Sequence, residues 1–183
     1  MKKNIGMGVF LLVVMALAAP RAGIAQNAFN QKDKVVSAGI GLGLYGLYGS
    51  STLPPVFVAF ETGVADKITV GGIAAYAGSS EDFIDGKWKY SYIVLSARGA
   101  YHFLEREKSF DAYGGLGLGY TIVSSSVEYT NPAIQHFGFS ASGSYFFFDL
   151  FVGGRYYFNP RLAGMAELGY GVGFLRIGVS YKI

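Results

Sequence analysis

Charged side chains in the middle of otherwise apolar segments are the residues with the clearest chemical role in this sequence. The set holds four acids and four bases: Glu61, Asp111, Asp149 and Glu167, with Arg98, Arg155, Arg176 and Lys182. A charge removed from water is strongly unfavourable unless a partner of opposite sign neutralises it. The balance of the set therefore predicts a salt-bridge network in the interior of the fold. The functional alternative is a gated path for ions, and the sequence favours the structural interpretation.

Histidine near serine is the second arrangement with chemical potential, because an imidazole can activate a hydroxyl as a nucleophile. His136 lies a few residues before Ser140 and Ser142. We identify no partner that would orient this imidazole, so polar surface is the favoured interpretation. The other histidine, His102, is expected to be solvated or at an interface.

Neither a metal ion nor an organic cofactor is expected. No set of His, Asp and Glu has the spacing of metal ligands. The glycines alternate within apolar segments, whereas those of a phosphate-binding loop stand between a strand and a helix. We expect glycines such as Gly41, Gly117 and Gly153 to leave room for long interior side chains.

The elements that must position these residues are strands, because apolar and polar residues alternate with a period of two. The chain is rich in Gly, Tyr and Phe (27, 14 and 15 residues) and only 15% charged. After the N-terminus it has no apolar run long enough for a transmembrane helix. This combination predicts an all-β fold, an eight-stranded antiparallel transmembrane up-and-down β-barrel. Such a barrel is narrow enough for side chains to fill it, which disfavours the ion path. The expected strands are residues 35–47, 56–64, 68–77, 88–103, 110–123, 145–158, 162–170 and 174–183.

Aromatic residues gather near the ends of the expected strands. One group is Tyr101, Phe103, Phe110, Tyr156 and Phe158, and the other is Tyr76, Trp88, Tyr90, Tyr120 and Tyr170. Amphipathic rings concentrate at the depth of lipid headgroups, so we interpret the groups as the two aromatic girdles of a membrane barrel. A carbohydrate-binding platform in the second group is the less favoured alternative.

The C-terminal strand ends on a hydrophobic residue and its carboxylate. Leu175, Ile177, Val179, Tyr181 and Ile183 alternate with Arg176, Gly178, Ser180 and Lys182. This ending resembles the C-terminal assembly signal of outer-membrane β-barrels, with Tyr181 and Ile183 on the lipid side, although that family more often ends in Phe. Together with the eight segments, it makes the chain similar to the small outer-membrane β-barrel superfamily of OmpX-like, OmpA-barrel-like and OmpW-like proteins. The resemblance implies insertion by the barrel assembly machinery and contact with outer-membrane lipids and lipopolysaccharide.

Residues 1–25 have the pattern of a secretory signal peptide, which leaves residues 26–183 as one barrel domain. Lys2 and Lys3 precede an apolar run, and Gly23, Ile24 and Ala25 form the expected cleavage site. Without the three bases of the signal, the 15 Lys and Arg fall to 12, equal to the 12 Asp and Glu. A mature chain without net charge argues against a nucleic-acid partner. The sequence contains no cysteine, so no disulfide framework is expected.

Connection lengths predict the orientation of the barrel. The turns after the second, fourth and sixth strands are short and are assigned to the periplasm, together with both termini. The connections after the first, third and fifth strands are longer and are assigned to the outside, although the short turn after the seventh strand breaks this pattern. The longest connection, residues 124–144, retains some alternation at Phe137, Phe139 and Ala141. We expect a monomer.

The favoured function is that of a non-enzymatic integral outer-membrane protein, structural or surface-interacting through its outer loops. One alternative is a lipid A-modifying enzyme, but the deacylases of that class place Ser two residues after His, and residue 138 is Gly. A second alternative is a conduit for small hydrophobic molecules. A soluble lipocalin-like barrel is the rival fold, which would turn the apolar face inward. Mid-strand charges such as Arg98, Glu167 and Arg176 on one face only argue against it.

Overall fold

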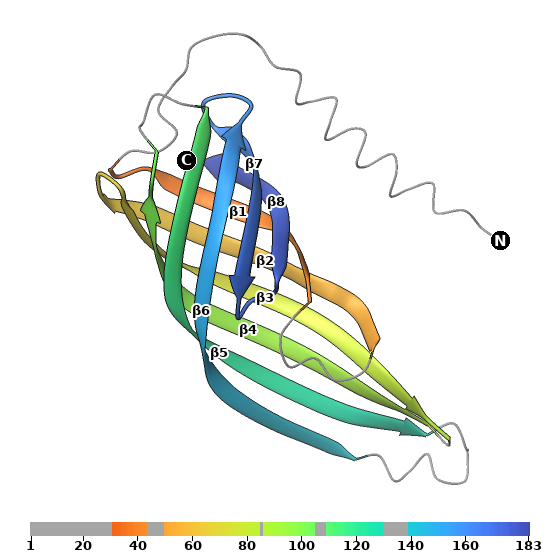
Figure 1. Cartoon of the computed structure of the whole chain (residues 1–183). Helices are drawn as coiled ribbons and strands as arrows, with labels where there is room; N and C mark the ends of the chain where they lie inside the picture. The colour runs from red at the N-terminus through yellow and green to blue at the C-terminus, as the bar shows by residue number, and fades with distance from the viewer. Residues whose placement is uncertain (1–30, 44–49, 85, 105–108, 130–138) are drawn as a thin grey trace, which may run out of the picture.

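The structure is a computed structural model that describes residues 31–43, 50–84, 86–104, 109–129 and 139–183, and these form one closed barrel (Figure 1). Each strand pairs antiparallel with the next, and β1 pairs with β8 from Val35–Lys182 to Leu42–Leu175. The all-β, eight-stranded fold is therefore confirmed. No helix in the described part of the chain is long and apolar enough to cross a membrane. The strands are β1 (Lys34–Leu42), β2 (Ser50–Ala65), β3 (Ile68–Phe83), β4 (Gly86–His102), β5 (Phe110–Tyr129), β6 (Ser140–Tyr157), β7 (Leu162–Tyr170) and β8 (Leu175–Lys182).

Alternation of exposure along the strands separates an inner from an outer face, as the sequence pattern predicts. In β8, Arg176 and Ser180 are fully buried, whereas Ile177 and Tyr181 are about half exposed on the other side. The outer wall consists of large apolar side chains, and Phe146 is the most exposed of those within the strands, at 82%. Charged groups therefore lie inside and apolar groups outside, the reverse of a water-soluble barrel.

Strand length divides the barrel into a short side and a tall side. β1, β7 and β8 have 8 or 9 residues, whereas β3 to β6 have 16 to 20. Because about 9–11 tilted residues of a strand suffice to cross a bilayer, β3 to β6 are longer than a membrane crossing requires. The last residue of β7, Tyr170, pairs with Leu150 of β6, so residues 140–149 of β6 extend past the end of β7. The tall strands continue together as a curved sheet beyond the short ones (Figure 1).

The expected boundaries are wrong on this tall side. Residues 50–55 were expected in a loop but open β2, and the expected loop 78–87 is mostly strand, divided between β3 and β4. The connection 124–144 includes the final residues of β5 and the first residues of β6. Serines and charges on both faces indicate that the sheet has left apolar surroundings, but they do not end its backbone pairing. Residues 1–25, 44–47 and His136 lie outside the described residues.

The turn between β7 and β8 folds into the barrel. Gly171 and Gly173 have φ angles of +119° and +103°, which side chains other than glycine rarely adopt. Val172 between them is 1% exposed and packs with Phe57 and Tyr92 in the barrel interior. The short glycine-rich turn thus places the apolar side chain of Val172 inside the barrel, at the end where β7 meets β8.

Closure of the barrel at the β1–β8 seam supplies a first prediction. Gly39 faces Gly178, and a Cβ atom at Gly39 would lie 2.1 Å from the backbone oxygen of Ile177. Gly39→Val should destabilise the folded barrel by about 1–3 kcal/mol because the seam has to open. Its neighbour Ala38 points outward, so Ala38→Val is the matched control. Folded and unfolded barrels can be separated on gels when the samples are not heated, so the folded fraction can be followed across a urea titration. The urea concentration at half-unfolding should be lower for Gly39→Val than for the wild type and Ala38→Val. Equal urea midpoints for all three chains would contradict this packing.

Candidate functional site

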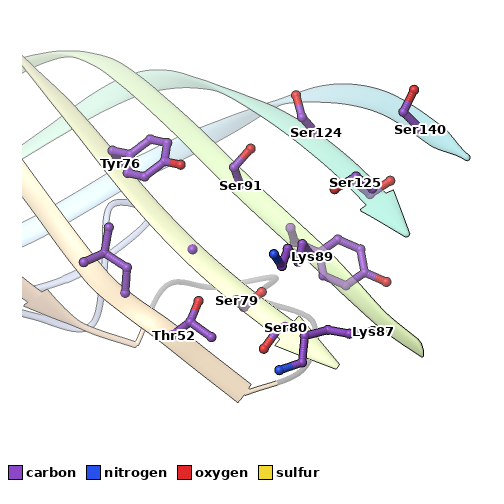
Figure 2. A pocket seen from close by; sticks show the side chains of 14 residues that line it. Thr52, Tyr76, Ser79, Ser80, Lys87, Lys89, Ser91, Ser124, Ser125 and Ser140 are labelled. Carbon is purple, nitrogen blue, oxygen red and sulfur yellow. The ribbon is translucent and has the colours of Figure 1, made fainter. Parts of the chain in front are cut away.

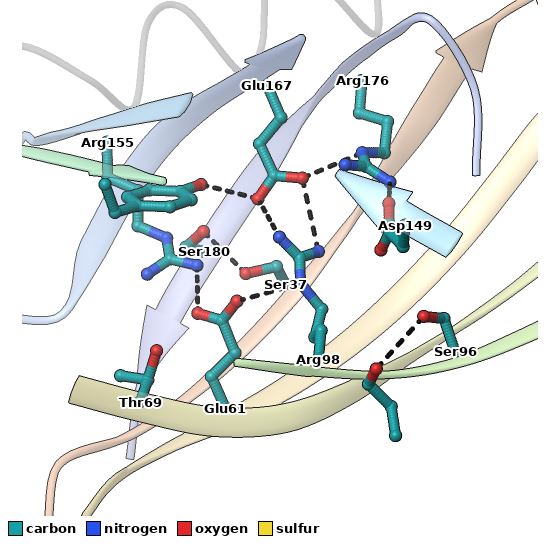
Figure 3. Close-up of polar contacts among 12 residues, drawn as sticks. Ser37, Glu61, Thr69, Ser96, Arg98, Asp149, Arg155, Glu167, Arg176 and Ser180 are labelled. Atoms are coloured by element: carbon teal, nitrogen blue, oxygen red, sulfur yellow. Dashed lines mark hydrogen bonds and ion pairs between the residues drawn. The ribbon is translucent and has the colours of Figure 1, made fainter. Parts of the chain in front are cut away.

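Glu167 of β7 is the centre of the interior charge network (Figure 3). Its Oε1 lies 2.8 Å from Nη2 of Arg98 on β4, and its Oε2 lies 2.9 Å from Nε of Arg176 on β8. The hydroxyl of Tyr113 on β5 donates a hydrogen bond of 2.8 Å to Oε1. Four strands therefore converge on one carboxylate, whose exposure is 1%.

A second carboxylate, Glu61 of β2, continues the network. It forms a direct ion pair with Arg155 of β6, and its Oε1 lies 3.7 Å from Nε of Arg98. Arg98 thus bridges Glu61 and Glu167 (Figure 3). At the other side of Glu167, Nη1 of Arg176 lies 3.5 Å from Oδ1 of Asp149. The charges alternate in sign, as low-dielectric surroundings require.

Aromatic faces and a glycine complete the packing of the guanidinium groups. The guanidinium carbon of Arg98 lies 3.6 Å from the ring centre of Phe151, and that of Arg155 lies 4.4 Å from the ring centre of Tyr113. Both contacts are cation–π interactions. A Cβ atom at Gly153 would lie 2.6 Å from Cγ of Glu167. This glycine leaves the room that the sequence analysis assigned to it.

His102 belongs to the buried network, so its expected solvation is wrong. Its exposure is 3%, and Nδ1 lies 2.7 Å from Oδ1 of Asp111. Nε2 lies 3.3 Å from the hydroxyl of Thr69. The other Asp111 oxygen is 3.8 Å from Arg155, which links this group to the main network. The sequence signal was present, because His102 has the same strand parity as Arg98.

Thr69, His102 and Asp111 have the order of a nucleophile, a base and an orienting acid. The structure nevertheless leaves the Thr69 side chain only 1% exposed, with His102 and Asp111 at 3%. All three side chains therefore lie in the barrel interior, away from the outer surface. The two contacts hold the imidazole of His102 between Thr69 and Asp111.

Lys182 lies apart from the other seven charged residues of the predicted set. Its ammonium group lies 2.9 Å from Oδ2 of Asp33, at the rim where β1 begins and β8 ends. Its side chain is 14% exposed, whereas the side chains of the other seven residues are at most 3% exposed. Four carboxylates and three guanidiniums thus share the interior, and His102 contacts the carboxylate of Asp111.

An apolar layer, which the sequence analysis did not identify, fills the interior next to the charges. It is built from Phe57, Ile73, Tyr92, Val94, Met165 and Val172, with three alanines, and Phe147 packs against it. Inward-facing apolar residues are not conspicuous in the sequence because the outer face of the same strands is also apolar. The charged network and the apolar layer both consist of buried side chains of the barrel interior.

Most of the predicted aromatic girdle lies on the outer wall. Eight of its members do so: Tyr76, Tyr101, Phe103, Phe110, Tyr120, Tyr156, Phe158 and Tyr170. Trp88 and Tyr90 do not, since Trp88 pairs with the buried Val127, and Tyr90 packs against the apolar layer. Placing these two in the girdle was wrong, because β4 keeps its alternation up to Trp88. The assembly-signal residues Tyr181 and Ile183 are exposed on the outer wall, at 46% and 72%.

Among the described residues, no group of three or more His, Cys, Asp or Glu side chains is arranged to hold a metal ion. The interior acids are instead neutralised by arginines. Their positions therefore fit a structural network better than a cation site.

Comparison with known proteins identifies the fold. No protein-family model and no curated protein matches the sequence. Solved structures do: the outer membrane protein OprG from Pseudomonas aeruginosa has a TM-score of 0.63 at 17% identity, over 88% of this chain and 99% of that one. The N-terminal β-barrel domain of Pseudomonas aeruginosa OprF gives 0.55 at 14%, over 85% and 100%. Ail, the attachment invasion locus protein of Yersinia pestis, in complex with the heparin analogue sucrose octasulfate, gives 0.57 at 16%, over 84% and 99%. The chain thus has the fold of the small outer-membrane β-barrels.

Removal of the central carboxylate is the most direct test of the network. Glu167→Gln leaves Arg98 and Arg176 without their shared counter-charge and should lower the free energy of unfolding by about 3–5 kcal/mol. Glu128→Gln removes an exposed pair with Lys89 and should cost at most about 1 kcal/mol. Urea unfolding in detergent micelles, followed by circular dichroism, measures both. A Glu167→Gln barrel as stable as the Glu128→Gln barrel would show that the network is not needed for stability.

Proposed function

We propose that the protein is an integral outer-membrane β-barrel without enzymatic activity, and that its closed barrel is anchored in lipid. The part of β3 to β6 that extends past the shorter strands, called the tall sheet below, would make structural or surface contacts. The observation that carries this proposal is the division of side chains between the two faces. Seven charged residues, none more than 5% exposed, lie inside, while residues such as Leu116, Phe146 and Phe148 are 70–82% exposed outside. Exposing this apolar wall to water would be unfavourable in proportion to its area, whereas the hydrocarbon of a membrane would cover it.

The aromatic residues of the wall support the membrane position. Tyr101 and Phe103 form one close ring pair, as do Tyr156 and Phe158, each with centroids 5.7 Å apart, at the rim that carries the described chain ends. Tyr76, Tyr120 and Tyr170 lie toward the opposite rim. Rings at both boundaries of an apolar band are typical of outer-membrane barrels. In this orientation the termini are periplasmic and the tall strands extend outside the cell.

The filled interior supports a structural role over a conduit. The ion pairs around Glu167 fill one part of the interior, and the apolar layer with Val172 fills the next. A continuous water path would have to separate charges that stabilise one another in a low dielectric. The only histidine among the described residues, His102, is held within the same network.

The tall sheet supplies the surface for external contacts. On the inner side of the sheet, the ring of Trp88 lies 6.3 Å from that of Tyr90, stacked, and 6.4 Å from that of Phe139. Phe139 is 58% exposed. Exposed aromatic groups that cluster on a rigid sheet are a common basis of recognition. We therefore assign recognition to this sheet, and we propose a monomer that is inserted by the barrel assembly machinery.

Membrane fractionation and electrical recording test this function together. The expressed chain should remain in the outer-membrane fraction after carbonate extraction, and it should migrate faster on gels when it is not heated. Reconstituted in planar bilayers, it should give no stable stepwise conductance, because the interior is filled. A carbonate-soluble chain would contradict the membrane position, and reproducible single-channel steps would contradict the sealed interior.

A further inference from the structure

The outer wall over β3–β6 changes from apolar to polar along the strands, row by row. Residues that pair across neighbouring strands form rows, and one such row contains Ala74, Leu95, Tyr120 and Phe146. Four residues further along each strand, the row is Gly78, Ser91, Ser124 and Ser142. Four residues of strand span about 13 Å. A boundary between two media therefore crosses this wall between Ala74 and Gly78.

A groove lies below that boundary, on the apolar side. Small residues on β3 and β4, Gly72, Ala74 and Ala97, form its floor, and Phe60, Leu118 and Phe146 stand around it. Its volume is about 780 Å³. The small side chains lower the surface between the neighbouring large ones, which leaves an apolar depression in the wall that an acyl chain could occupy.

A second groove lies on the polar side of the boundary, on the same outer wall (Figure 2). Its volume is about 560 Å³, and Tyr76 lines it at the side nearer the apolar groove. Five of the residues that line it are serines of the outer face: Ser80, Ser91, Ser124, Ser126 and Ser140. Ser91, Ser124 and Ser140 project from the same side of three neighbouring strands (Figure 2). Serine hydroxyls both donate and accept hydrogen bonds, as sugar hydroxyls do.

Two lysines line the second groove, Lys87 and Lys89, and each forms an ion pair with an acid beside the groove. Lys89 forms an ion pair of 2.5 Å with Glu128, and Lys87 forms one of 3.2 Å with Asp82. A headgroup carrying a bare phosphate would have to displace these acids to gain a full counter-charge. A neutral, hydroxyl-rich headgroup can hydrogen-bond to the serines and leave both pairs in place.

We propose that the two grooves form one binding site for a glycolipid of the outer leaflet, with an acyl chain along Ala74 and Ala97 and the sugar headgroup on the serine groove. The inference rests on the proposed membrane position. It goes beyond general contact with lipid, because it assigns one wall of the barrel, one headgroup chemistry and the residues that distinguish them. Tyr76 lies between the two grooves, where the ester region of the lipid would pass.

Native mass spectrometry of the full chain released from nanodiscs tests the site. The nanodiscs contain equal amounts of digalactosyldiacylglycerol and phosphatidylglycerol with the same acyl chains. Wild-type protein should retain the sugar lipid about tenfold over the phospholipid, the preference that two additional hydrogen bonds of ordinary strength supply. Ala74→Phe, which fills the apolar groove, should lose both lipids. Ser91→Val/Ser124→Val should keep lipid binding but lose the preference.

Two controls separate the site from general effects. Ala166→Phe places the same ring on the outer face of β7, away from both grooves, and should retain the sugar lipid as the wild type does. Thr62→Val/Ser109→Val removes two hydroxyl groups from residues that line neither groove, and should keep the preference. Three results would overturn the lipid site but not the proposed function. The first is equal retention of the two lipids by the wild type, and the second is a preference of the wild type for the phospholipid. The third is an equal loss of lipid in Ala74→Phe and Ala166→Phe. A wild-type chain that does not enter the bilayer would overturn the proposed function as well.

Discussion

The buried carboxylate of Glu167 lies between the buried guanidinium groups of Arg98 and Arg176. Each of these charges is tolerable only because the others are present, and the strands that carry them, β4, β7 and β8, are thereby held at fixed separations. Arg98 extends the same constraint to β2 through Glu61. The network therefore connects inward-facing side chains of four strands: β2, β4, β7 and β8.

This constraint also explains the composition of the outer wall. In a strand whose inner positions carry charge, the alternate positions face a different medium. Here most of these positions are Leu, Val, Ile, Phe or Tyr, with small residues such as Gly72, Ala74 and Ala97 on β3 and β4. The wall remains apolar only up to Tyr76 and Ile122, after which serines and lysines follow on the same face. Hydrogen-bonded strands continue across this change, so the same four strands, β3 to β6, carry an apolar and a polar stretch of outer wall.

Much of this architecture could be predicted from the sequence, because alternation with a period of two specifies both strands and faces. Arg98, Arg155, Glu167 and Arg176 were placed correctly on the inner face by that parity alone. Strand ends could not be placed in the same way, since the serines of β5 and β6 continue the pairing where the apolar pattern stops. Trp88 was assigned to the girdle because it lies near an expected strand end. The alternation of inward and outward positions along β4 places it on the inner face instead. Which acid pairs with which base depends on the stagger of the strands, and the sequence carries no direct record of it.

Collision measurements on spin labels test most directly whether the uncharged wall faces hydrocarbon. The chain has no cysteine, so single cysteines can be introduced and labelled at Leu118, Val152 and Ile177, which lie on three different strands of the wall. With the barrel in lipid vesicles, the account predicts that each label collides more often with oxygen, which dissolves in the bilayer, than with a water-soluble nickel chelate. More frequent collisions with nickel at all three positions would show that water covers this wall, and would contradict the account.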